Sequence, residues 1–169
     1  MLTNEGCRKR LERFRKRLEG HGDAAVIHKP EHLLYLANFF PLPNSLNLQS
    51  SSFLLLERNG PATLFTDNWL KPSGETVADG VVVVDWYTCT GPAEDRAMAV
   101  GGALRKRLKS LRVRTLAAEL GQIPHYVASA AATVSTKIVK ICPCTFCHAL
   151  PNATRFSATP CSIISTERN

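Results

Sequence analysis

The chain has 169 residues, a formal net charge of +7 and a hydrophobic share of 44%. This length and composition predict one globular domain, or one domain with a tail, that has enough apolar residues for a core. The sequence shows no secretory signal after the first Met, and no apolar run is long enough to cross a bilayer. We therefore expect a cytoplasmic protein whose six cysteines are reduced.

Residues 5–19 predict a basic amphipathic helix. Its apolar residues recur at helical spacing on one face: Cys7, Leu11, Phe14 and Leu18. Arg and Lys fill the opposite face, a pattern that permits nucleic acid or an anionic surface as a partner. Because Glu12 and Glu19 interrupt the basic face and no aromatic residues alternate with the charges, we favour a solvated outer face.

A strand, a turn and a short helix follow in residues 23–40. The apolar run 24–27 predicts a buried strand, Lys29-Pro30 predicts the turn, and the apolar segment 32–40 predicts a helix. Asn38 stands where this helix should end. After Gly, Asn is the residue best able to adopt the left-handed conformation of a helix C-cap.

Residues 51–66 predict an antiparallel hairpin, with strands 51–57 and 62–66 joined at Asn59-Gly60. The continuous apolar run 53–56 is typical of a strand that is covered on both faces. Asp67 then caps a short turn that carries Trp69.

The remaining elements alternate between strands and helices. We expect strands at 81–84, 113–116 and 137–141, and helices at 92–108 and 124–132. Pro92 suits the first turn of its helix, and Gly101-Gly102 either weakens that helix or lets another element approach closely. The whole order predicts an α/β fold with a mixed sheet, in which parallel crossovers accompany one antiparallel hairpin.

Two motifs carry a resemblance to a known family. The first is Tyr35-Leu36-Ala37-Asn38-Phe39, and the second is the hairpin SSFLLLERNGPATLFTD at residues 51–67. Together with the basic helix, their order and spacing resemble the N-terminal domain of creatinase, prolidase and Xaa-Pro aminopeptidases over residues 8–130. The family usually has Gly where this chain has Asn38. The resemblance implies a three-layer domain with a mixed sheet flanked by helices.

In this family the catalytic machinery lies in a following pita-bread domain. There two Asp, one His and two Glu hold a pair of divalent metals that activate water, except in creatinase, which is metal-free. After Asp95 the only acidic residues of this chain are Glu119 and Glu167. We therefore expect no catalytic residues and no cofactor in this chain, which would be a truncated, non-catalytic N-terminal domain. Creatinase, dipeptidase and aminopeptidase activities share this layout, so the parent substrate stays open.

The resemblance also implies a role in oligomer contacts and in walling off an active site. The expected partners are a second copy of the chain or a catalytic domain, and not a membrane or nucleic acid. The segment 39–50 and the nearby Trp69 are the candidate substrate-access residues, with Phe39, Phe40 and Asn44 in that loop. The alternative is that Phe39, Phe40 and Trp69 are core residues.

From Thr133 onward the sequence departs from the family pattern. Acidic residues nearly vanish, and Ser, Thr, Cys and Pro become frequent. We expect residues 1–132 to form the domain and residues 133–169 to be a disordered or out-of-frame tail. Cys144, Cys147 and His148 match the C-x-x-C-H pattern of haem attachment, which needs an export signal. With Cys142 they form a set that is able to bind zinc, which we rank above haem attachment but below a chance cluster in an unstructured tail.

Other chemical motifs are scarce. The sequence has no nucleophile elbow, P-loop or dinucleotide-binding glycine motif. Outside the tail the histidines show no ligand spacing, because Lys29-Pro30 separates His28 from His32. A stand-alone binding module that uses its basic helices on an acidic partner is the alternative to the peptidase-associated domain.

Overall fold

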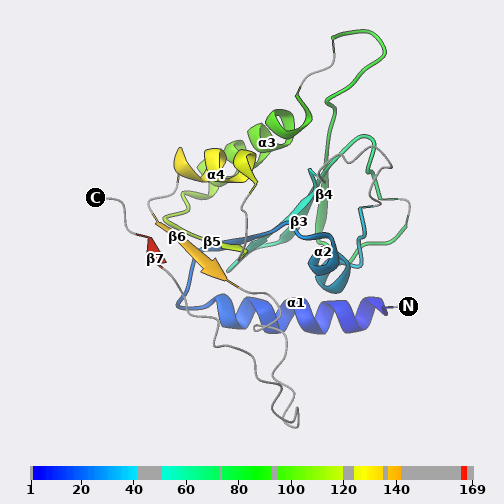
Figure 1. The fold of residues 1–169 in the computed structure, drawn as a ribbon. Helices are drawn as coiled ribbons and strands as arrows, with labels where there is room; N and C mark the ends of the chain where they lie inside the picture. The colour runs from blue at the N-terminus through cyan, green and yellow to red at the C-terminus, as the bar shows by residue number, and fades with distance from the viewer. Residues whose placement is uncertain are drawn as a thin grey trace.

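The computed structural model describes residues 2–41, 51–72, 74–92, 95–119, 124–134, 137–141 and 165–166. They form a seven-stranded sheet of order β4-β3-β2-β1-β5-β6-β7, with helices on both faces (Figure 1). The helices are α1 (Asn4–Leu18), α2 (Pro30–Ala37), α3 (Arg96–Leu111) and α4 (His125–Ala132). The strands are β1 (Ala24–Ile27), β2 (Phe53–Glu57), β3 (Ala62–Asp67), β4 (Gly80–Val84), β5 (Thr115–Glu119), β6 (Lys137–Ile141) and β7 (Ser165–Thr166).

The sheet is mixed, as the sequence predicts. β2 runs antiparallel to both β1 and β3, so the hairpin brings β3 back parallel to β1. β4 pairs parallel with β3, β5 pairs parallel with β1, and β6 pairs parallel with β5. Five strands therefore point the same way and end at one edge of the sheet. The α/β prediction with parallel crossovers and one hairpin is confirmed.

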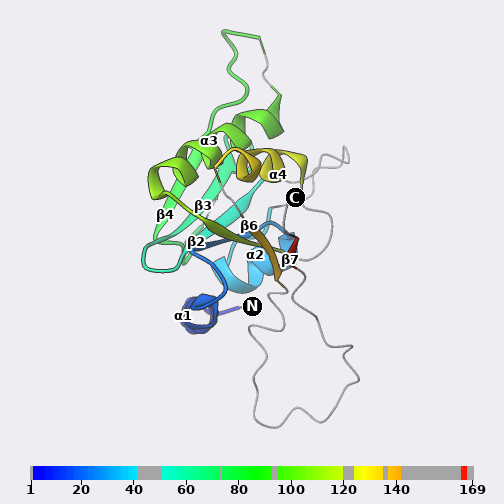
Figure 2. The same ribbon diagram turned by 90° about the vertical axis from the view of Figure 1, so that its left-hand side faces the viewer.

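The two faces of the sheet bury separate hydrophobic clusters. Helices α1 and α2 cover the face that carries Ala25 and Ile27, whereas α3 and α4 cover the face that carries Ala24 and Val26 (Figure 2). Side chains of successive strand residues point to opposite faces, so an uninterrupted apolar strand supplies both clusters. Each fully buried side chain of the size of Ile27 stabilises the fold by roughly 1.5–3 kcal/mol.

Helix α1 forms as its sequence pattern predicts. The Thr3 side chain caps its N-terminus by accepting a hydrogen bond from the Gly6 N–H at 3.2 Å. The four predicted apolar residues of this helix are buried, namely Cys7, Leu11, Phe14 and Leu18. The predicted left-handed cap of α2 is also present, because Asn38 has φ 53°.

Helix α3 and strand β5 begin later in the chain than predicted, and a side-chain carboxylate explains each start. Helix α3 begins at Arg96, and its N-cap is Asp95, whose carboxylate accepts a hydrogen bond from the Met98 N–H at 2.8 Å. Pro92 therefore lies before the helix and not in its first turn. Strand β5 begins at Thr115, because the Asp23 carboxylate accepts hydrogen bonds from the backbone at the start of the strand. Strand β5 also extends beyond its predicted end at residue 116, and its last residue is Glu119.

Part of the segment set apart as a tail belongs to the sheet. Strand β6 pairs with β5 over five residues, and the two-residue β7 pairs with β6. The domain therefore extends beyond residue 132. Residues 142–164 and 167–169 lie outside the described residues, and the prediction that they are disordered or out of frame stays a prediction.

Candidate functional site

The carboxyl edge of the sheet holds two buried carboxylates. Asp67 ends β3 and Glu119 ends β5, and both side chains are almost completely buried. In open α/β sheets, ligands bind outside the carboxyl ends of the parallel strands. A buried carboxylate is costly unless it is paired and hydrogen-bonded. The partners of these two residues therefore decide what this edge can do.

Glu119 connects β5 to the turn between β1 and α2. Its Oε2 atom accepts hydrogen bonds from the backbone N–H groups of His28 and Lys29, each at 2.9 Å. The Nδ1 atom of His28 lies 3.0 Å from the same oxygen, and Nδ1 of His32 contacts Oε1. The two histidines that the sequence analysis kept apart therefore meet on one carboxylate. Helix α2 begins at Pro30, so His28 precedes the helix as predicted, and the contact of both rings with Glu119 is a feature that the sequence analysis missed.

These contacts also set the charge of Glu119. Burial raises the pKa of this carboxyl, but hydrogen bonds from the His28 and His32 rings and from two backbone N–H groups outweigh burial. The pKa of Glu119 therefore lies well below its ordinary value, and the side chain is a carboxylate at neutral pH. Since its oxygens are already engaged, this carboxylate is suited to holding the turn and not to accepting a proton from a substrate.

Asp67, at the end of β3, connects this strand to the following turn and to helix α3. Its Oδ1 atom accepts from the backbone N–H groups of Trp69 and Leu70, at 2.9 and 3.0 Å, which confirms the predicted capped turn. Its Oδ2 atom accepts from the Ser51 hydroxyl at 2.6 Å and from Nε of Arg96 at 2.5 Å. The ion pair with Arg96 thus fixes the first residue of α3 against the end of β3.

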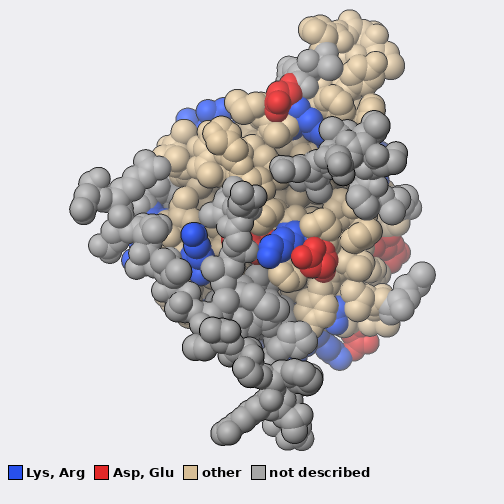
Figure 3. Space-filling model, in the orientation of Figure 1, with Lys and Arg blue, Asp and Glu red and all other residues tan. Residues whose placement is uncertain are grey.

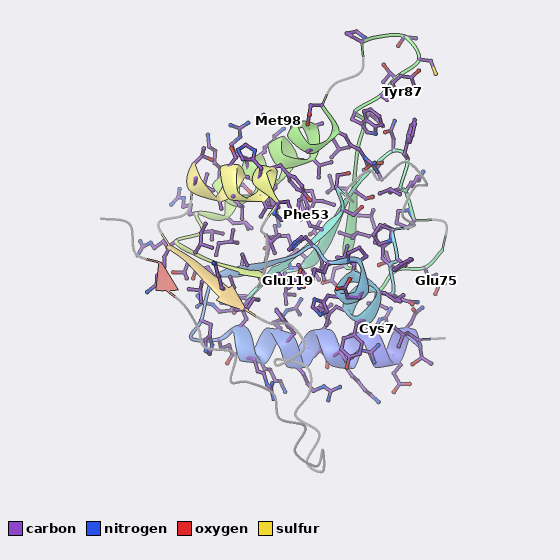
Figure 4. The ribbon with its side chains drawn as sticks, in the orientation of Figure 1. Cys7, Phe53, Glu75, Tyr87, Met98 and Glu119 are labelled. Atoms are coloured by element: carbon purple, nitrogen blue, oxygen red, sulfur yellow. The ribbon has the colours of Figure 1, made fainter. Side chains whose placement is uncertain are left out.

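An exposed apolar surface lies beside Asp67, and we define it by Trp69, Tyr87 and the three valines 81–83 of β4. These side chains are between 36% and 51% exposed. The Trp69 ring contacts both Trp86 and Tyr87 edge-on, with ring centroids 5.2 and 6.3 Å apart. Figure 4 shows Tyr87 on the segment that extends away from the domain between β4 and α3, with Met98 at the same end of the molecule.

The predicted substrate-access residues differ in how far they are exposed to solvent. Phe39 is buried in the core, which confirms the alternative interpretation for this residue. Phe40 and Trp69 are 45% and 51% exposed, so they are not core residues and that interpretation is wrong for them. Asn44 and residues 42–50 lie outside the described residues. The structure therefore places Trp69 on the apolar surface and leaves the role of the loop a prediction.

The family-motif residues hold α2 against α1. Leu36 is buried, and the Arg10 guanidinium lies over the Tyr35 ring, 4.2 Å from its centroid. Arg10 also donates to the Tyr35 carbonyl oxygen at 2.8 Å, and the Asn38 amide donates to Asn4 at 2.7 Å. These contacts give the motif a structural role at the interface between the two helices.

The basic residues of the chain do not gather into a single patch on the face that Figure 3 shows. Several of them have acidic partners: Lys9 pairs with Glu5, Arg15 with Asp79, and Arg107 with Glu57. Paired charges are less available to a nucleic acid than a continuous basic stripe. This arrangement gives no support to the stand-alone binding module.

Two open hollows lie at the opposite, amino edge of the sheet. They have volumes of about 460 and 340 Å³, and both include Asp23 and Arg58. The Asp23 carboxylate accepts from two backbone N–H groups and lies 3.3 Å from Arg58. Hydrogen bonding to Thr115, which outweighs burial, lowers the pKa of Asp23. The Asp23 carboxylate therefore holds the start of β5 in place.

Metal binding has no support from the part of the chain that the structure describes. Within those ranges, no group of three or more His, Cys, Asp or Glu side chains could hold a metal ion. The predicted zinc set of Cys142, Cys144, Cys147 and His148 lies outside them. None of the described helices is both long and apolar enough to span a membrane.

Comparison with known proteins agrees with this architecture. The model of the Creatinase/Prolidase N-terminal domain matches residues 10–145. No curated protein matches the chain.

Solved structures with the same fold include three peptidases. An Xaa-Pro dipeptidase from Bacillus anthracis is 16% identical, with a TM-score of 0.55 over 80% of this chain and 34% of that chain. The N-terminal domain of an X-Pro dipeptidase from Streptococcus pyogenes has the same identity and TM-score, over 79% of this chain and 99% of its own. An Xaa-Pro aminopeptidase from Streptococcus pyogenes is 14% identical, with a TM-score of 0.59 over 86% of this chain and 97% of that chain. The present chain thus spans about a third of the Bacillus anthracis enzyme.

Proposed function

This chain belongs to the Creatinase/Prolidase N-terminal domain family, and we propose that it is a non-catalytic association domain of an Xaa-Pro peptidase-type metallohydrolase. In this proposal it binds a second copy of itself and helps to shape an active site whose metal ligands another domain supplies. The family match supports the parent class, and the solved relatives of similar fold are Xaa-Pro dipeptidases and an aminopeptidase.

The exposed apolar surface at β4 is the observation that carries the proposal. Strand β4 ends the sheet, and among the described residues it pairs only with β3. Its outer edge therefore presents unpaired backbone groups beside Val81, Val82 and Val83. Such an edge is a template for pairing with another strand, and an apolar patch next to it favours association.

A second copy of the chain is the partner that fits this edge. A twofold axis places the same patch of both copies against each other, so an apolar strand meets an equally apolar strand. The four consecutive valines of β4 present the same side chain in either direction, and Trp69 and Tyr87 extend the apolar area beyond the strand. Pairing would satisfy the free backbone groups and remove these side chains from water.

Light scattering coupled to size-exclusion chromatography tests the association. We expect a dimer for the wild-type chain and a monomer for Val82→Lys, because a charge on an edge strand opposes pairing. Ser110→Lys is the matched control, since it adds the same charge at the exposed end of α3 and should remain dimeric. A monomeric wild-type chain, or dimers from all three proteins, would overturn association through β4.

A peptidase assay tests the non-catalytic part of the proposal. The purified chain is incubated with Mn²⁺ and an Xaa-Pro dipeptide, and release of proline is measured. We expect no release above the buffer rate, since two-metal hydrolysis needs ligands that bridge both ions. Metal-dependent turnover that a chelator abolishes would show that the chain is itself an enzyme.

A further inference from the structure

The larger of the two hollows at the amino edge of the sheet is lined by several arginines. It has a volume of about 460 Å³ and lies where the turn after β2 meets the segment between α3 and β5. Arg58 comes from the turn, and Arg112 and Arg114 come from the segment. The adjoining smaller hollow shares Arg58 and adds Lys137 from β6. A concave surface that gathers charges of one sign attracts ions of the opposite sign.

The acidic residues in the lining of the larger hollow, Asp23 and Glu57, do not neutralise it. Oε1 of Glu57 accepts hydrogen bonds from Nε and Nη2 of Arg107, at 3.0 and 2.6 Å. Oδ1 of Asp23 lies 3.3 Å from Arg58. Each carboxylate is thus balanced by a guanidinium of its own. The charge of Arg112 therefore has no counterpart among the acidic residues that line the hollow.

The backbone of Arg112 is a second, independent observation. This residue caps the C-terminus of α3 in the left-handed conformation, with φ 51°, where Gly is the most frequent residue. The left-handed conformation costs conformational energy for any residue with a Cβ, whereas Gly adopts it readily. The Arg112 side chain is exposed, and within the described part of the chain it has no ion pair that would offset this cost. Strain of this kind is typical of residues whose side chains contact a ligand.

We propose that the larger hollow binds a small molecule that carries a phosphate group, with Arg112 as the main contact and Arg58 and Arg114 beside it. Guanidinium groups match the oxygens of phosphate with paired hydrogen bonds, and more than one of them suits a dianion better than a single carboxylate. The volume of the hollow lies in the range of small-molecule sites, about 300–1,000 Å³. A nucleic acid fits less well, because its affinity requires basic residues spread along many phosphates.

Isothermal titration calorimetry of the full chain tests the site, at a salt concentration of about 0.15 M that screens diffuse attraction. Pyrophosphate is the probe, acetate is the monocarboxylate control, and a short single-stranded RNA is the macromolecular alternative. We expect saturable binding of pyrophosphate at a single site per chain and no measurable binding of acetate. No saturation with pyrophosphate, equal binding of acetate, or tighter binding of the RNA than of pyrophosphate would overturn the proposal.

Two variants tie binding to Arg112. Arg112→Gly removes the guanidinium and the left-handed strain together, so it should bind pyrophosphate roughly tenfold more weakly while its melting temperature rises by a few degrees. Arg8→Gln is the matched control, because it removes the same charge from an exposed position on α1 and should leave the affinity unchanged. A merely structural Arg112 would not weaken binding in a variant that is more stable. Unchanged affinity in Arg112→Gly, or an equal loss in both variants, would show that no phosphate site exists here.

This site goes beyond the association proposed at β4 and does not depend on it. The larger hollow lies beside β1, β2, β5 and α3, whereas β4 ends the sheet. Val82→Lys should therefore bind pyrophosphate with the affinity of the wild type. Loss of binding in Val82→Lys alone would assign the site to the dimer and would overturn a site within one chain. A wild-type monomer that binds pyrophosphate would instead overturn only the association at β4.

Discussion

The Glu119 carboxylate accepts a hydrogen bond from the backbone N–H of His28 at 2.9 Å, across 91 positions of the sequence. This contact joins the end of β5 to the turn that leads from β1 into α2. The neighbouring N–H of Lys29 donates to the same oxygen. A buried carboxylate that receives backbone donors fixes the direction in which a turn leaves the sheet, and here it positions the helix that carries the family motif.

Replacing Glu119 with Gln should destabilise the fold. The amide keeps the shape of the side chain but loses the charge that strengthens its hydrogen bonds, and its NH₂ group cannot accept. Hydrogen bonds to a charged group contribute about 1.5–3 kcal/mol each, so we expect a loss of about 2–3 kcal/mol in the free energy of unfolding. Urea denaturation measures this. Glu12→Gln, on the exposed face of α1, should change stability little, and equal midpoints for the two variants would contradict a structural role for Glu119.

The stability supplied by Glu119 should depend on pH. Burial raises the pKa of its carboxyl, but hydrogen bonds from His28 and His32 lower this pKa by more than burial raises it. The pKa in the folded state therefore lies below the ordinary value of 4.5. A depressed folded pKa gives stability that is fully present above 4.5 and is lost as the pH falls below it. The difference in urea midpoint between the wild type and Glu119→Gln should therefore shrink from about pH 6 to about pH 3. A constant difference would show that the charge of Glu119 contributes nothing.

Two adjacent glycines of α3 should respond in opposite ways to alanine. A Cβ at Gly101 would lie 2.9 Å from Cβ of Tyr126 and 3.2 Å from its carbonyl oxygen, whereas a Cβ at Gly102 meets nothing within 4 Å. Gly101→Ala should lower stability by about 1–3 kcal/mol through overpacking against α4. Gly102→Ala should raise it by about 0.5–1 kcal/mol, since Ala is the better helix former. Thermal melts compare the pair, and stabilisation by both substitutions would mean that α3 and α4 lie farther apart in solution.

Local patterns were sufficient to predict most of the fold. The run 24–27, the Asn59-Gly60 turn and the apolar spacing of α1 each depend on residues close in sequence, and each element is found at or near its predicted position. The start of β5 was missed because the Asp23 carboxylate sets it, from a point some 90 residues earlier in the chain. Long-range hydrogen bonds of this kind leave no periodic signal.

The candidate site was less predictable for the same reason. His28, His32 and Glu119 meet only after a parallel crossover places β5 beside β1. Likewise, Arg96 is one of many basic residues in the sequence, and only the fold shows that it forms a buried ion pair with Asp67. A usable signal was the position of each acidic residue after an apolar run, because Glu119 directly follows residues 116–118 and Asp67 follows residues 64–65 after a single Thr.

The left-handed cap at Asn38 yields a prediction that uses the resemblance to the family. Asn38 has φ 53° and its N–H donates to the Leu34 carbonyl, while its side chain bonds Asn4. Left-handed geometry costs an ordinary residue about 1–2 kcal/mol, so Asn38→Ala should lower stability by about that amount in urea denaturation. Asn38→Gly, the residue usual in the family, should stay close to the wild type, because the relief of backbone strain offsets the lost side-chain contact. Asn4→Ala removes that contact without touching the cap. If Asn38→Ala were no less stable than Asn38→Gly, the helix would not end in a left-handed residue.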